Sequence, residues 1–239
     1  MSKYKALLFD FDDTLFDFPK SEKIALERVF DYYNIEKNEE NLKTYIDENK
    51  KFWKGFEKGI YKGEADSDIR FKNFCKIIGR EEINYTQMCE IYIDELSTTA
   101  FPIENSVKML EKCCKVFDIY IITNALKRVN DKRSKIGGIM PFIKGRFISE
   151  EIGCSKPNKG FFDYIFDNVA FNKDECLIIG DSLASDIGGA INYGIDCCWF
   201  NRRGAKTDLP VTYEVHSIAE LDELLEKLGK EEKYENSCS

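Results

Sequence analysis

The amino-acid sequence predicts an α/β protein with a doubly wound parallel sheet that is interrupted by an inserted helical domain. Short apolar runs rich in β-forming residues recur along the chain, and helical patterns separate the later runs, which is typical of βαβ units. Between the first two runs, about 85 residues show helical periodicity only. A chain of 239 residues, 43% of them hydrophobic, is long enough for one to two domains around a sizeable core.

The expected strands are six short apolar runs. They cover residues 4–9, 116–123, 146–149, 176–180, 197–200 and 212–215. Helices are expected over residues 105–115, 159–169 and 221–228. Asn105 and Ser106 are suited to cap the first of these helices, and Gly229 is suited to end the last.

The stretch from residue 17 to residue 101 is expected to form a separate helical domain. Its apolar side chains recur at helical spacing in two places, which are Leu26, Val29, Phe30 and Tyr33, and then Phe71, Phe74, Cys75 and Ile78. A single crossover between parallel strands needs only about a dozen residues. We therefore expect residues 1–16 and 102–239 to form the core domain and residues 17–101 to form the insertion.

Composition and charge exclude several classes of protein. The net charge is −8, the isoelectric point is near 5.0 and no dense run of Lys and Arg is present, so binding to polymeric nucleic acid is not expected. No apolar run reaches about 18 residues and no signal segment is seen, which predicts a cytoplasmic protein that does not bind a membrane. A monomer or a weak homo-oligomer is expected.

The cysteines are expected to be reduced thiols that pack as small apolar side chains. There are 9 of them, an odd number, and none forms a C-x-x-C pair. The vicinal pairs Cys113/Cys114 and Cys197/Cys198 leave a metal or redox site open as the alternative.

Two carboxylates directly follow the first expected strand. Asp10 and Asp12 lie at the carboxyl end of that strand, which is the edge where open α/β sheets bind ligands. If the chain stayed extended, both side chains would point to the same side. A turn or a helix cap is the alternative, because Asp is common in both.

Polar side chains also follow other expected strands, or precede a helix. They are Thr123 and Asn124 after the second strand, Asp181, Ser182 and Asp186 after the fourth, and Lys156 ahead of the helix over residues 159–169. The N-terminus of a helix favours anions. The sequence therefore predicts that acids, a hydroxyl, an amide and a lysine converge on one edge of one sheet.

This set of side chains is suited to a magnesium ion and a phosphate group, with Mn²⁺ as an alternative ion. Asp10, Asp12 and Asp181 offer a few hard oxygen ligands, as Mg²⁺ prefers. Lys156 and the Thr123 hydroxyl can hold phosphoryl oxygens. One carboxylate can attack phosphorus while a second protonates the leaving alkoxide and later deprotonates water, and Asp10 and Asp12 suit these two roles.

Four segments in this order, DFDDTLF, IITN, SKPNK and GDSLASD, resemble the motifs of the haloacid dehalogenase superfamily of phosphohydrolases. The resemblance extends from Lys5 to about Leu228, and the helical insertion resembles the small cap domain that this superfamily carries on its Rossmann-like core. It implies a Mg²⁺-dependent phosphomonoester hydrolase that works through an aspartyl phosphate. Ala125 departs from the pattern, where Gly is common, and residues 102–104 lack the usual Pro-Gly.

The resemblance also implies roles for single residues. It makes Asp10 the nucleophile and a metal ligand, and Asp12 the general acid and base and a metal ligand through its backbone carbonyl. Asp181 is a further metal ligand, and Asp186 and Ser182 surround these ligands without touching the ion.

The phosphate group is implied to be bound by Thr123, Lys156 and the backbone amide of Asn124. Longer segments, namely NKKFWKGFEKG, RFISEEIGCSKPNKGFFDY and GDSLASDIGGAINYGIDCCWFN, are similar to the bacterial pyrimidine 5′-nucleotidases of that superfamily. This similarity implies a nucleoside 5′-monophosphate as the substrate.

An aromatic ring near one of three positions in the insertion is expected to stack on the nucleobase. These positions are Phe18, Trp53 and Phe56, and packing inside the cap is the alternative for each of them.

Three other enzymatic functions and one non-enzymatic function are the alternatives. The first is a phosphatase for another small metabolite, such as a sugar phosphate or phosphoglycolate, and the second is a phosphomutase. The third is a metal-free dehalogenase, in which Asp12 and Asp181 would have no task. A binding module is disfavoured because every catalytic position holds a competent residue.

Two further features are not assigned to the chemistry. His216, the only histidine, is expected to have a surface or packing role. The basic side chains of Lys127, Arg128, Lys132 and Arg133 are expected to form a solvated helix face.

Overall fold

The computed structural model describes residues 3–230, apart from the side chain of Glu64. The chain separates into two compact units. The α/β unit comprises the described parts of residues 1–17, 102–125 and 137–239, and the helical unit comprises residues 18–101 and 126–136. Helix α6 (Lys127–Ile136) therefore groups with the helical unit, although it follows the second strand along the chain.

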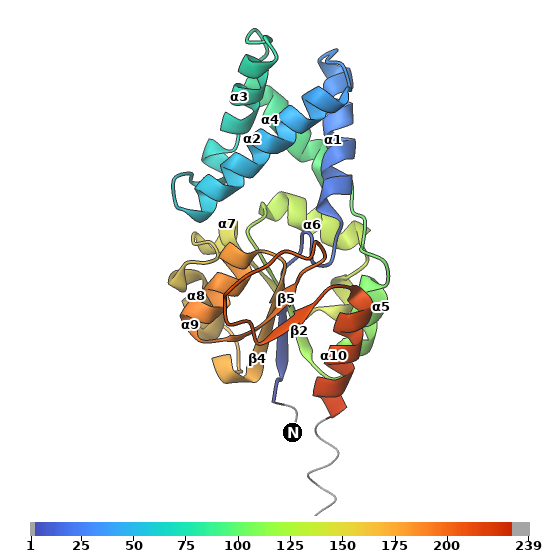
Figure 1. Ribbon diagram of the computed structural model, residues 1–239, viewed down its shortest axis with the longest axis vertical. Coiled ribbons are helices and arrows are strands. Elements are labelled where there is room, and N and C mark those ends of the chain that lie inside the picture. The colour runs from blue at the N-terminus through green and yellow to red at the C-terminus, as the bar shows by residue number, and fades with distance from the viewer. Residues whose placement is uncertain (1–2, 231–239) are drawn as a thin grey trace, which may run out of the picture. The chain divides into compact units, whose positions relative to one another are not determined.

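A six-stranded parallel sheet forms the centre of the α/β unit (Figure 1). Its strands are β1 (Ala6–Phe9), β2 (Asp118–Thr123), β3 (Gly145–Ile148), β4 (Cys176–Gly180), β5 (Asp196–Phe200) and β6 (Tyr213–Val215). Their order across the sheet is β3-β2-β1-β4-β5-β6, and every neighbouring pair is parallel. The chain thus winds outward from β1 in both directions, which confirms the predicted doubly wound fold class, and each expected strand forms close to its predicted bounds.

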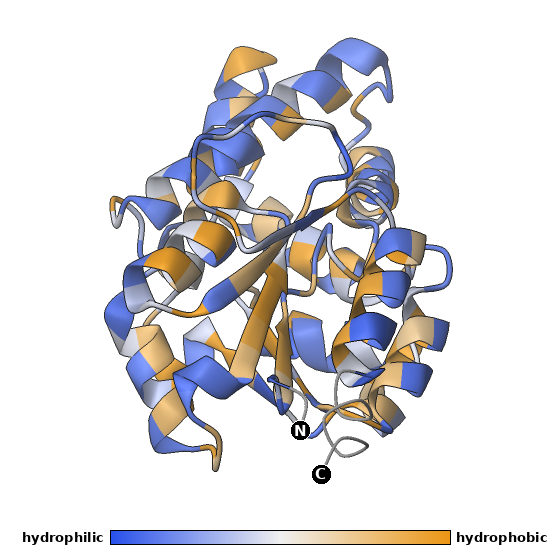
Figure 2. Ribbon diagram, turned by 60° about the horizontal axis from the view of Figure 1, so that its bottom comes forward, coloured by the Kyte–Doolittle hydropathy of each residue, from blue (hydrophilic) through white to orange (hydrophobic). Residues whose placement is uncertain are grey.

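The strands are apolar because helices cover both faces of the sheet (Figure 2). These helices are α5 (Ser106–Cys113), α7 (Ser149–Ile152), α8 (Lys159–Asp167), α9 (Gly188–Tyr193) and α10 (Ile218–Lys230), with short 3-10 turns at η2 (Met140–Phe142) and η3 (Lys173–Glu175). Along β1, Leu8 packs in one buried cluster with Ile165 of α8. Leu7 and Phe9 point to the opposite face of the sheet and are also fully buried.

Two helix ends differ from the sequence prediction. Asn105 precedes α5, but its backbone is left-handed with φ 66 and its side chain makes no capping bond. Gly229 lies inside α10 rather than ending it. A Cβ atom at Gly229 would lie 3.1 Å from Cγ1 of Val116, so this glycine allows close packing of the helix.

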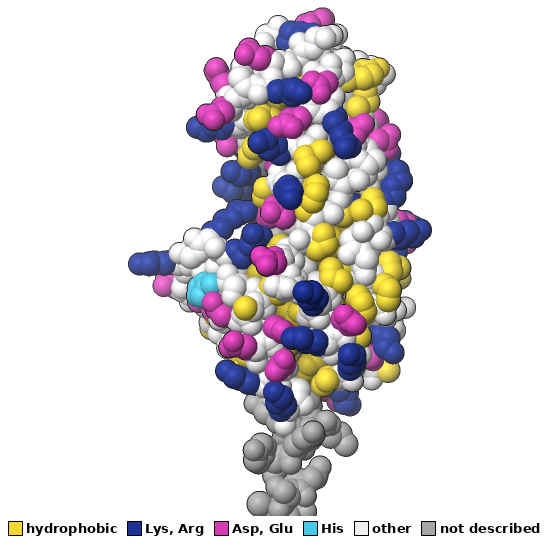
Figure 3. All heavy atoms as spheres, turned by 90° about the vertical axis from the view of Figure 1, so that its right-hand side faces the viewer, with side chains coloured by type: hydrophobic (Ala, Val, Ile, Leu, Met, Phe, Trp, Pro, Cys, Tyr) yellow, Lys and Arg dark blue, Asp and Glu magenta, His cyan; other side chains and the backbone are white. Residues whose placement is uncertain are grey.

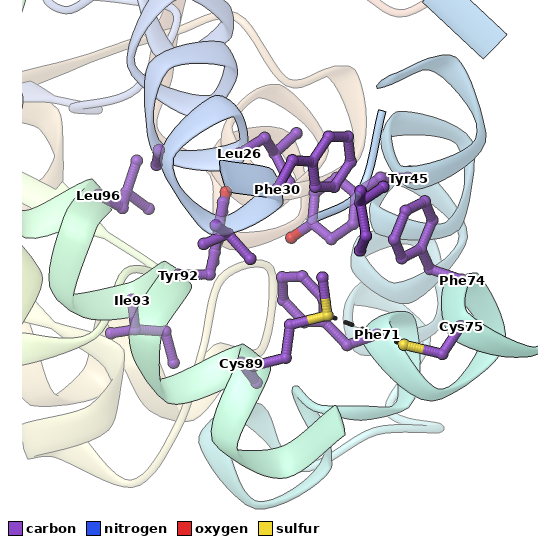
Figure 4. Close-up of a cluster of buried hydrophobic side chains, with 14 of the residues drawn as sticks. Leu26, Phe30, Tyr45, Phe71, Phe74, Cys75, Cys89, Tyr92, Ile93 and Leu96 are labelled. Carbon is purple, nitrogen blue, oxygen red and sulfur yellow. Dashed lines mark hydrogen bonds between the residues drawn. The ribbon is translucent and has the colours of Figure 1, made fainter. Parts of the chain in front are cut away.

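The helical unit is built around one apolar core. Its elements are α1 (Phe18–Tyr32), α2 (Glu39–Glu57), α3 (Ile69–Ile77), α4 (Tyr85–Ser97) and α6, with a 3-10 turn at η1 (Gly63–Asp66). Leu26, Phe30, Phe71 and Phe74 point toward one another in this core (Figure 4), and the rings of Phe30 and Phe74 stack with their centroids 5.3 Å apart. The helical periodicity predicted from these side chains is confirmed.

One residue of α6 corrects the predicted solvated face. Arg133 is 1% exposed, and its Nε donates a hydrogen bond to the Thr99 carbonyl at 3.0 Å. Val129, one helical turn earlier, packs in the core of the helical unit. Arg128 does reach the surface, where it forms an ion pair with Glu90 at 2.7 Å.

The predictions of a surface position for His216 and of packing for Cys197 and Cys198 agree with the structure. His216 is exposed, and Figure 3 shows the single histidine side chain at the surface. Cys197 and Cys198 are buried in β5, and the described cysteines form no disulfide. Among the described residues, no helix combines the length and apolar character needed to cross a membrane.

Candidate active site

Polar side chains from three neighbouring strands meet at the carboxyl edge of the sheet. Asp10 follows β1, Thr123 ends β2 and Asp181 follows β4, and β1 lies between the other two strands. The N–H of Asp10 donates to the Ile179 carbonyl at 2.8 Å, so Asp10 continues the ladder with β4. The parallel ladder therefore holds these residues beside one another.

Lys156 lies at this edge, and only 1% of its side chain is exposed. Its Nζ donates to Oδ1 of Asp10 at 2.7 Å, to Oδ1 of Asp186 at 2.7 Å and to the Ile122 carbonyl at 2.8 Å. All three ammonium protons therefore have an acceptor. Burial alone would lower the pKa of Lys156, but the charges of Asp10 and Asp186 outweigh it and raise the pKa above its ordinary value.

Asn124 holds the backbone of Lys156 through its side-chain amide. Its Nδ2 donates to the Lys156 carbonyl at 3.0 Å, and the Lys156 N–H donates to Oδ1 of Asn124 at 3.0 Å. The hydroxyl oxygen of Thr123 accepts the Ala125 N–H at 3.1 Å, which leaves the hydroxyl proton available for another acceptor. The structure thus brings Thr123, Asn124 and Lys156 together.

Asp10, Asp181 and Asp186 form a carboxylate cluster, in which one oxygen from each lies within 4.8 Å of the others. Gly180 makes this arrangement possible, because a Cβ atom there would lie 2.3 Å from Oδ2 of Asp186. The N–H of Ser182 donates to that same Oδ2 at 3.1 Å. A single π-helical turn, η4 (Leu183–Ile187), carries Asp186 back toward β4.

Burial and crowding raise the pKa of two carboxyls in this cluster. Burial is the largest cause at Asp10, whose pKa is raised to about 7 although Lys156 lowers it in part. The pKa of Asp181 is raised well above its ordinary value by burial and by the charges of Asp10 and Asp186. A divalent cation bound among these carboxyls would favour their charged forms. Hard oxygen donors in small number also fit Mg²⁺.

Asp12 lies in the loop after β1 rather than on the strand, which ends at Phe9. It is half-buried and forms an isolated parallel bridge with Phe16. Its negative charge contributes to the raised pKa of Asp10, so the two carboxyls are electrostatically close. The loop, not an extended strand, sets the direction of its side chain.

The three aromatic candidates belong to the helical unit. Phe18 begins α1 and packs against the buried core of that unit. Trp53 and Phe56 are half-buried on α2, and their rings meet edge to face with centroids 5.5 Å apart. Phe52 and Tyr61 stack beside them at 5.3 Å, and these four side chains form the α2 aromatic cluster.

The sequence motifs do not predict two further residues of this edge. Asn201 directly follows β5 and is buried, and its side chain bonds both the N–H and the carbonyl of Ala205 at 2.9 Å. Arg203 donates from Nη2 to Oδ2 of Asp13 at 2.8 Å. The rule that identifies Asp10 and Asp181, a polar residue directly after a strand, also identifies Asn201.

Comparison with known proteins identifies the family of this chain. The model of the haloacid dehalogenase-like hydrolases matches residues 7–200. The HAD-hydrolase YfnB of Bacillus subtilis is 34% identical over 229 residues, which cover 94% of this chain and 97% of YfnB. A crystal structure of YfnB bound to magnesium has a TM-score of 0.89 and 33% identity, and the match covers 94% of this chain and 99% of that one.

Two further relatives are pyrimidine 5′-nucleotidases by name. PynA of Streptococcus pneumoniae is 32% identical over 230 residues, which cover 94% of this chain and 96% of PynA. YjjG of Escherichia coli is 29% identical over 226 residues, which cover 93% of this chain and 98% of YjjG. Since the family match runs from β1 to β5 and includes Asp10, Thr123, Lys156 and Asp181, the chain belongs to the haloacid dehalogenase-like hydrolases and is an enzyme.

Proposed function

We propose that this enzyme hydrolyses phosphate monoesters, with pyrimidine nucleoside 5′-monophosphates as its substrates. The contact that carries the proposal is the 2.7 Å hydrogen bond from the buried Lys156 ammonium to the Asp10 carboxylate, beside two further carboxylates. A nucleophile, a fixed positive charge and an acidic cluster are the parts that phosphoryl transfer requires. The names of PynA and YjjG support the choice of substrate.

Asp10 is the proposed nucleophile. One of its carboxylate oxygens attacks phosphorus, and the bond from phosphorus to the leaving oxygen breaks as an aspartyl phosphate forms. Asp12, in its acid form, gives its proton to the departing alkoxide. Lys156 lies against Asp10, so a phosphoryl group brought to Asp10 comes within reach of the ammonium, and the Thr123 hydroxyl can donate to another phosphoryl oxygen.

Water completes the cycle. Asp12, now a carboxylate, accepts a proton from a water molecule whose oxygen attacks phosphorus. The bond from phosphorus to the Asp10 oxygen breaks, which releases inorganic phosphate and restores both acids. Asn124 keeps the Lys156 segment in place through both steps by its two hydrogen bonds at 3.0 Å.

Mg²⁺ is the proposed cofactor. Asp10, Asp181 and the backbone carbonyl of Asp12 would hold it, with Ser182 and Asp186 around them, and Asp186 also belongs to the carboxylate cluster. When bound, the ion supplies positive charge that offsets the acids and the phosphate. The residues themselves orient the phosphate group and move the protons.

The helical unit is the proposed source of substrate choice, because the edge of the sheet recognises any phosphate group. The α2 aromatic cluster offers half-buried rings, of which Trp53 and Phe56 are the candidates for stacking on a pyrimidine. Phe18 is the third candidate, although its packing against the core of the helical unit favours a structural role.

The mechanism is tested by the variant Asp10→Asn. Phosphate release from a pyrimidine nucleoside 5′-monophosphate with Mg²⁺ should fall at least about a thousandfold, because the amide is a poor nucleophile. The matched control is Asp174→Asn, an exposed acid on η3 at the opposite end of β4, which should keep its turnover. Unchanged release by Asp10→Asn would contradict the mechanism, and so would unchanged release by the unaltered enzyme in a chelator.

The substrate is tested by comparing kcat/KM across pyrimidine and purine nucleoside 5′-monophosphates, ribose 5-phosphate and phosphoglycolate. The pyrimidine nucleotides should give the highest values. Trp53→Ala should raise the KM for nucleotides roughly tenfold through the lost stacking and leave the KM for ribose 5-phosphate unchanged. A preference for ribose 5-phosphate or phosphoglycolate would contradict the nucleotidase assignment while leaving the phosphatase chemistry intact.

A further inference from the structure

The loop after β1 contains a residue in an unfavourable backbone conformation. Asp13 has φ 60, in the left-handed region that residues other than glycine rarely adopt, although Asp tolerates it better than most. The N–H of Asp13 donates to the Phe16 carbonyl at 2.7 Å, and the Phe11 carbonyl accepts the N–H groups of Leu15 and Phe16 at 3.0 and 3.1 Å. The loop is therefore closed on itself, with Asp13 next to Asp12 at its tip.

A second loop of the α/β unit, residues 201–212, reaches the side chain of Asp13. The Nη2 atom of Arg203 lies 2.8 Å from Oδ2 of Asp13, and the two side chains are 71% and 22% exposed. The start of this second loop is fixed by the two hydrogen bonds between Asn201 and the backbone of Ala205. The ion pair thus joins the loop after β1 to an anchored loop after β5.

We propose that Arg203 is a positioning residue for the hydrolysis: through Asp13, it holds the Asp12 carboxyl group in the orientation that proton transfer needs. This inference rests on the proposed function, in which Asp12 is the general acid and base. Asp12 and Asp13 are joined by one peptide bond, so a change in the backbone angles of Asp13 changes the orientation of Asp12. A displacement of about 1 Å at a reacting group can cost roughly a hundredfold in rate.

Charge supports the same assignment. Asp13 adds a negative charge to an edge that already carries Asp10, Asp12 and Asp181, and Arg203 offsets it. Exposed ion pairs contribute little to folding stability. The effect of this pair should therefore be seen in turnover rather than in the stability of the fold.

The neighbouring arginine provides a matched control. Arg202 is exposed like Arg203, and its charge acts on Asp13 more weakly than that of Arg203, but in the described part of the chain it makes no hydrogen bond or ion pair. Arg203→Ala and Arg202→Ala remove the same charge from adjacent positions of one loop. They differ in the contact with Asp13, which is the contact that the proposal invokes.

The experiment measures kcat and KM for a pyrimidine nucleoside 5′-monophosphate with saturating Mg²⁺. Arg203→Ala should lower kcat roughly ten- to a hundredfold with KM within about twofold of the unaltered enzyme. Arg202→Ala should stay within about twofold in both constants, and Arg203→Lys, which retains a donor and the charge, should recover part of kcat. The melting temperatures of the three variants should match that of the unaltered enzyme.

A double-variant cycle tests whether Arg203 acts through Asp13. In Asp13→Asn the asparagine can adopt the left-handed backbone conformation but lacks the charge. This variant should therefore reproduce most of the fall in kcat that Arg203→Ala causes. Adding Arg203→Ala to Asp13→Asn should then lower kcat by less than about a further twofold.

The outcomes separate the inference from the proposed function. One contrary result is that Arg203→Ala lowers kcat as much in the Asp13→Asn variant as in the unaltered enzyme, and another is that it changes KM instead of kcat. Either result would indicate that Arg203 contacts the substrate directly and would overturn the proposal. Equal losses from Arg202→Ala and Arg203→Ala would overturn it too, since they would indicate a general charge effect. If the unaltered enzyme released no phosphate from any monoester, the proposed function would be wrong instead.

Discussion

Two buried cations, Lys156 in the α/β unit and Arg70 in the helical unit, are held in opposite ways. Lys156 donates to two carboxylates and a carbonyl, all within 2.8 Å. Arg70 is 5% exposed and donates to the neutral amide oxygen of Asn49 at 2.8 Å. Its guanidinium lies 5.2 Å from the ring centroids of both Phe52 and Tyr92, and its Nε atom has no hydrogen-bond partner among the described residues.

The comparison shows that burial of a charge does not identify an active site, whereas its partners do. Aromatic faces stabilise the Arg70 guanidinium without offering a group that reacts. The partners of Lys156 are carboxylates, one of which has a pKa raised to about 7 by burial despite the lysine. A buried cation in contact with a perturbed acid indicates chemistry, and a buried cation among rings indicates packing.

The largest effect that tests this contrast is expected from Lys156→Met. Phosphate release should fall at least about a thousandfold, because the proposed nucleophile loses its positive partner. Stability should fall by about 3–5 kcal/mol, because Asp10 and Asp186 remain buried without their partner. Kinetics and urea denaturation measure the two effects. Lys159→Met, at an exposed lysine on α8, is the control, and full turnover by Lys156→Met would remove the distinction between the two cations.

A smaller effect is expected from pH. The carboxyl of Asp10 has a pKa of about 7 in the folded protein and an ordinary value of 3.8 when unfolded. Between these values the folded state holds a proton that the unfolded chain has released, so stability falls as pH rises through this window. One proton accounts for at most about 1.4 kcal/mol per pH unit.

The measurement compares urea denaturation of the unaltered protein and Asp10→Asn from pH 4.5 to 7.5 in a chelator. The variant carries a permanently neutral group, so its stability relative to the unaltered protein should increase with pH. Saturating Mg²⁺ should flatten the pH dependence of the unaltered protein, since the ion replaces the proton. A relative stability that decreases with pH would show that Asp10 is not the group with the raised pKa.

The smallest effect should come from Arg70→Met. The methionine keeps much of the apolar volume, while the ring contacts and the bond to Asn49 are lost, so we expect a loss of about 1 kcal/mol in the free energy of unfolding. The kcat per folded molecule should be unchanged, in contrast to Lys156→Met. Loss of turnover without loss of stability would place Arg70 among the functional residues.

The sheet could be predicted because each strand is marked by a short stretch of its own sequence. Apolar runs of strand length mark each strand, and residues directly after them, such as Asp10 and Asp181, must meet at one edge when the strands are parallel. Periodicity also identifies the core of the helical unit, to which Phe30 and Phe74 belong. These predictions need no knowledge of how loops fold.

The remaining features depend on contacts between segments far apart in the sequence. The burial of Arg133 requires a helix after β2 to group with helices that precede it. The contact between Arg203 and Asp13 depends on the conformation of two loops separated by most of the chain. The position of Gly229 inside α10 likewise depends on Val116, which lies on another segment. Composition and spacing carry no signal for such pairs.

The side chain of Asn124 has one more consequence for the sheet. Its carboxamide donates one hydrogen bond to the Lys156 carbonyl and accepts one from the Lys156 N–H, which is the exchange that a hydrogen-bonded residue pair makes in an antiparallel ladder. The amide therefore ties the Lys156 segment to the end of β2 with an antiparallel type of pairing that the parallel sheet itself does not contain. The polar edge of the sheet thus gains at Lys156 the stiffness of a paired segment from a single side chain.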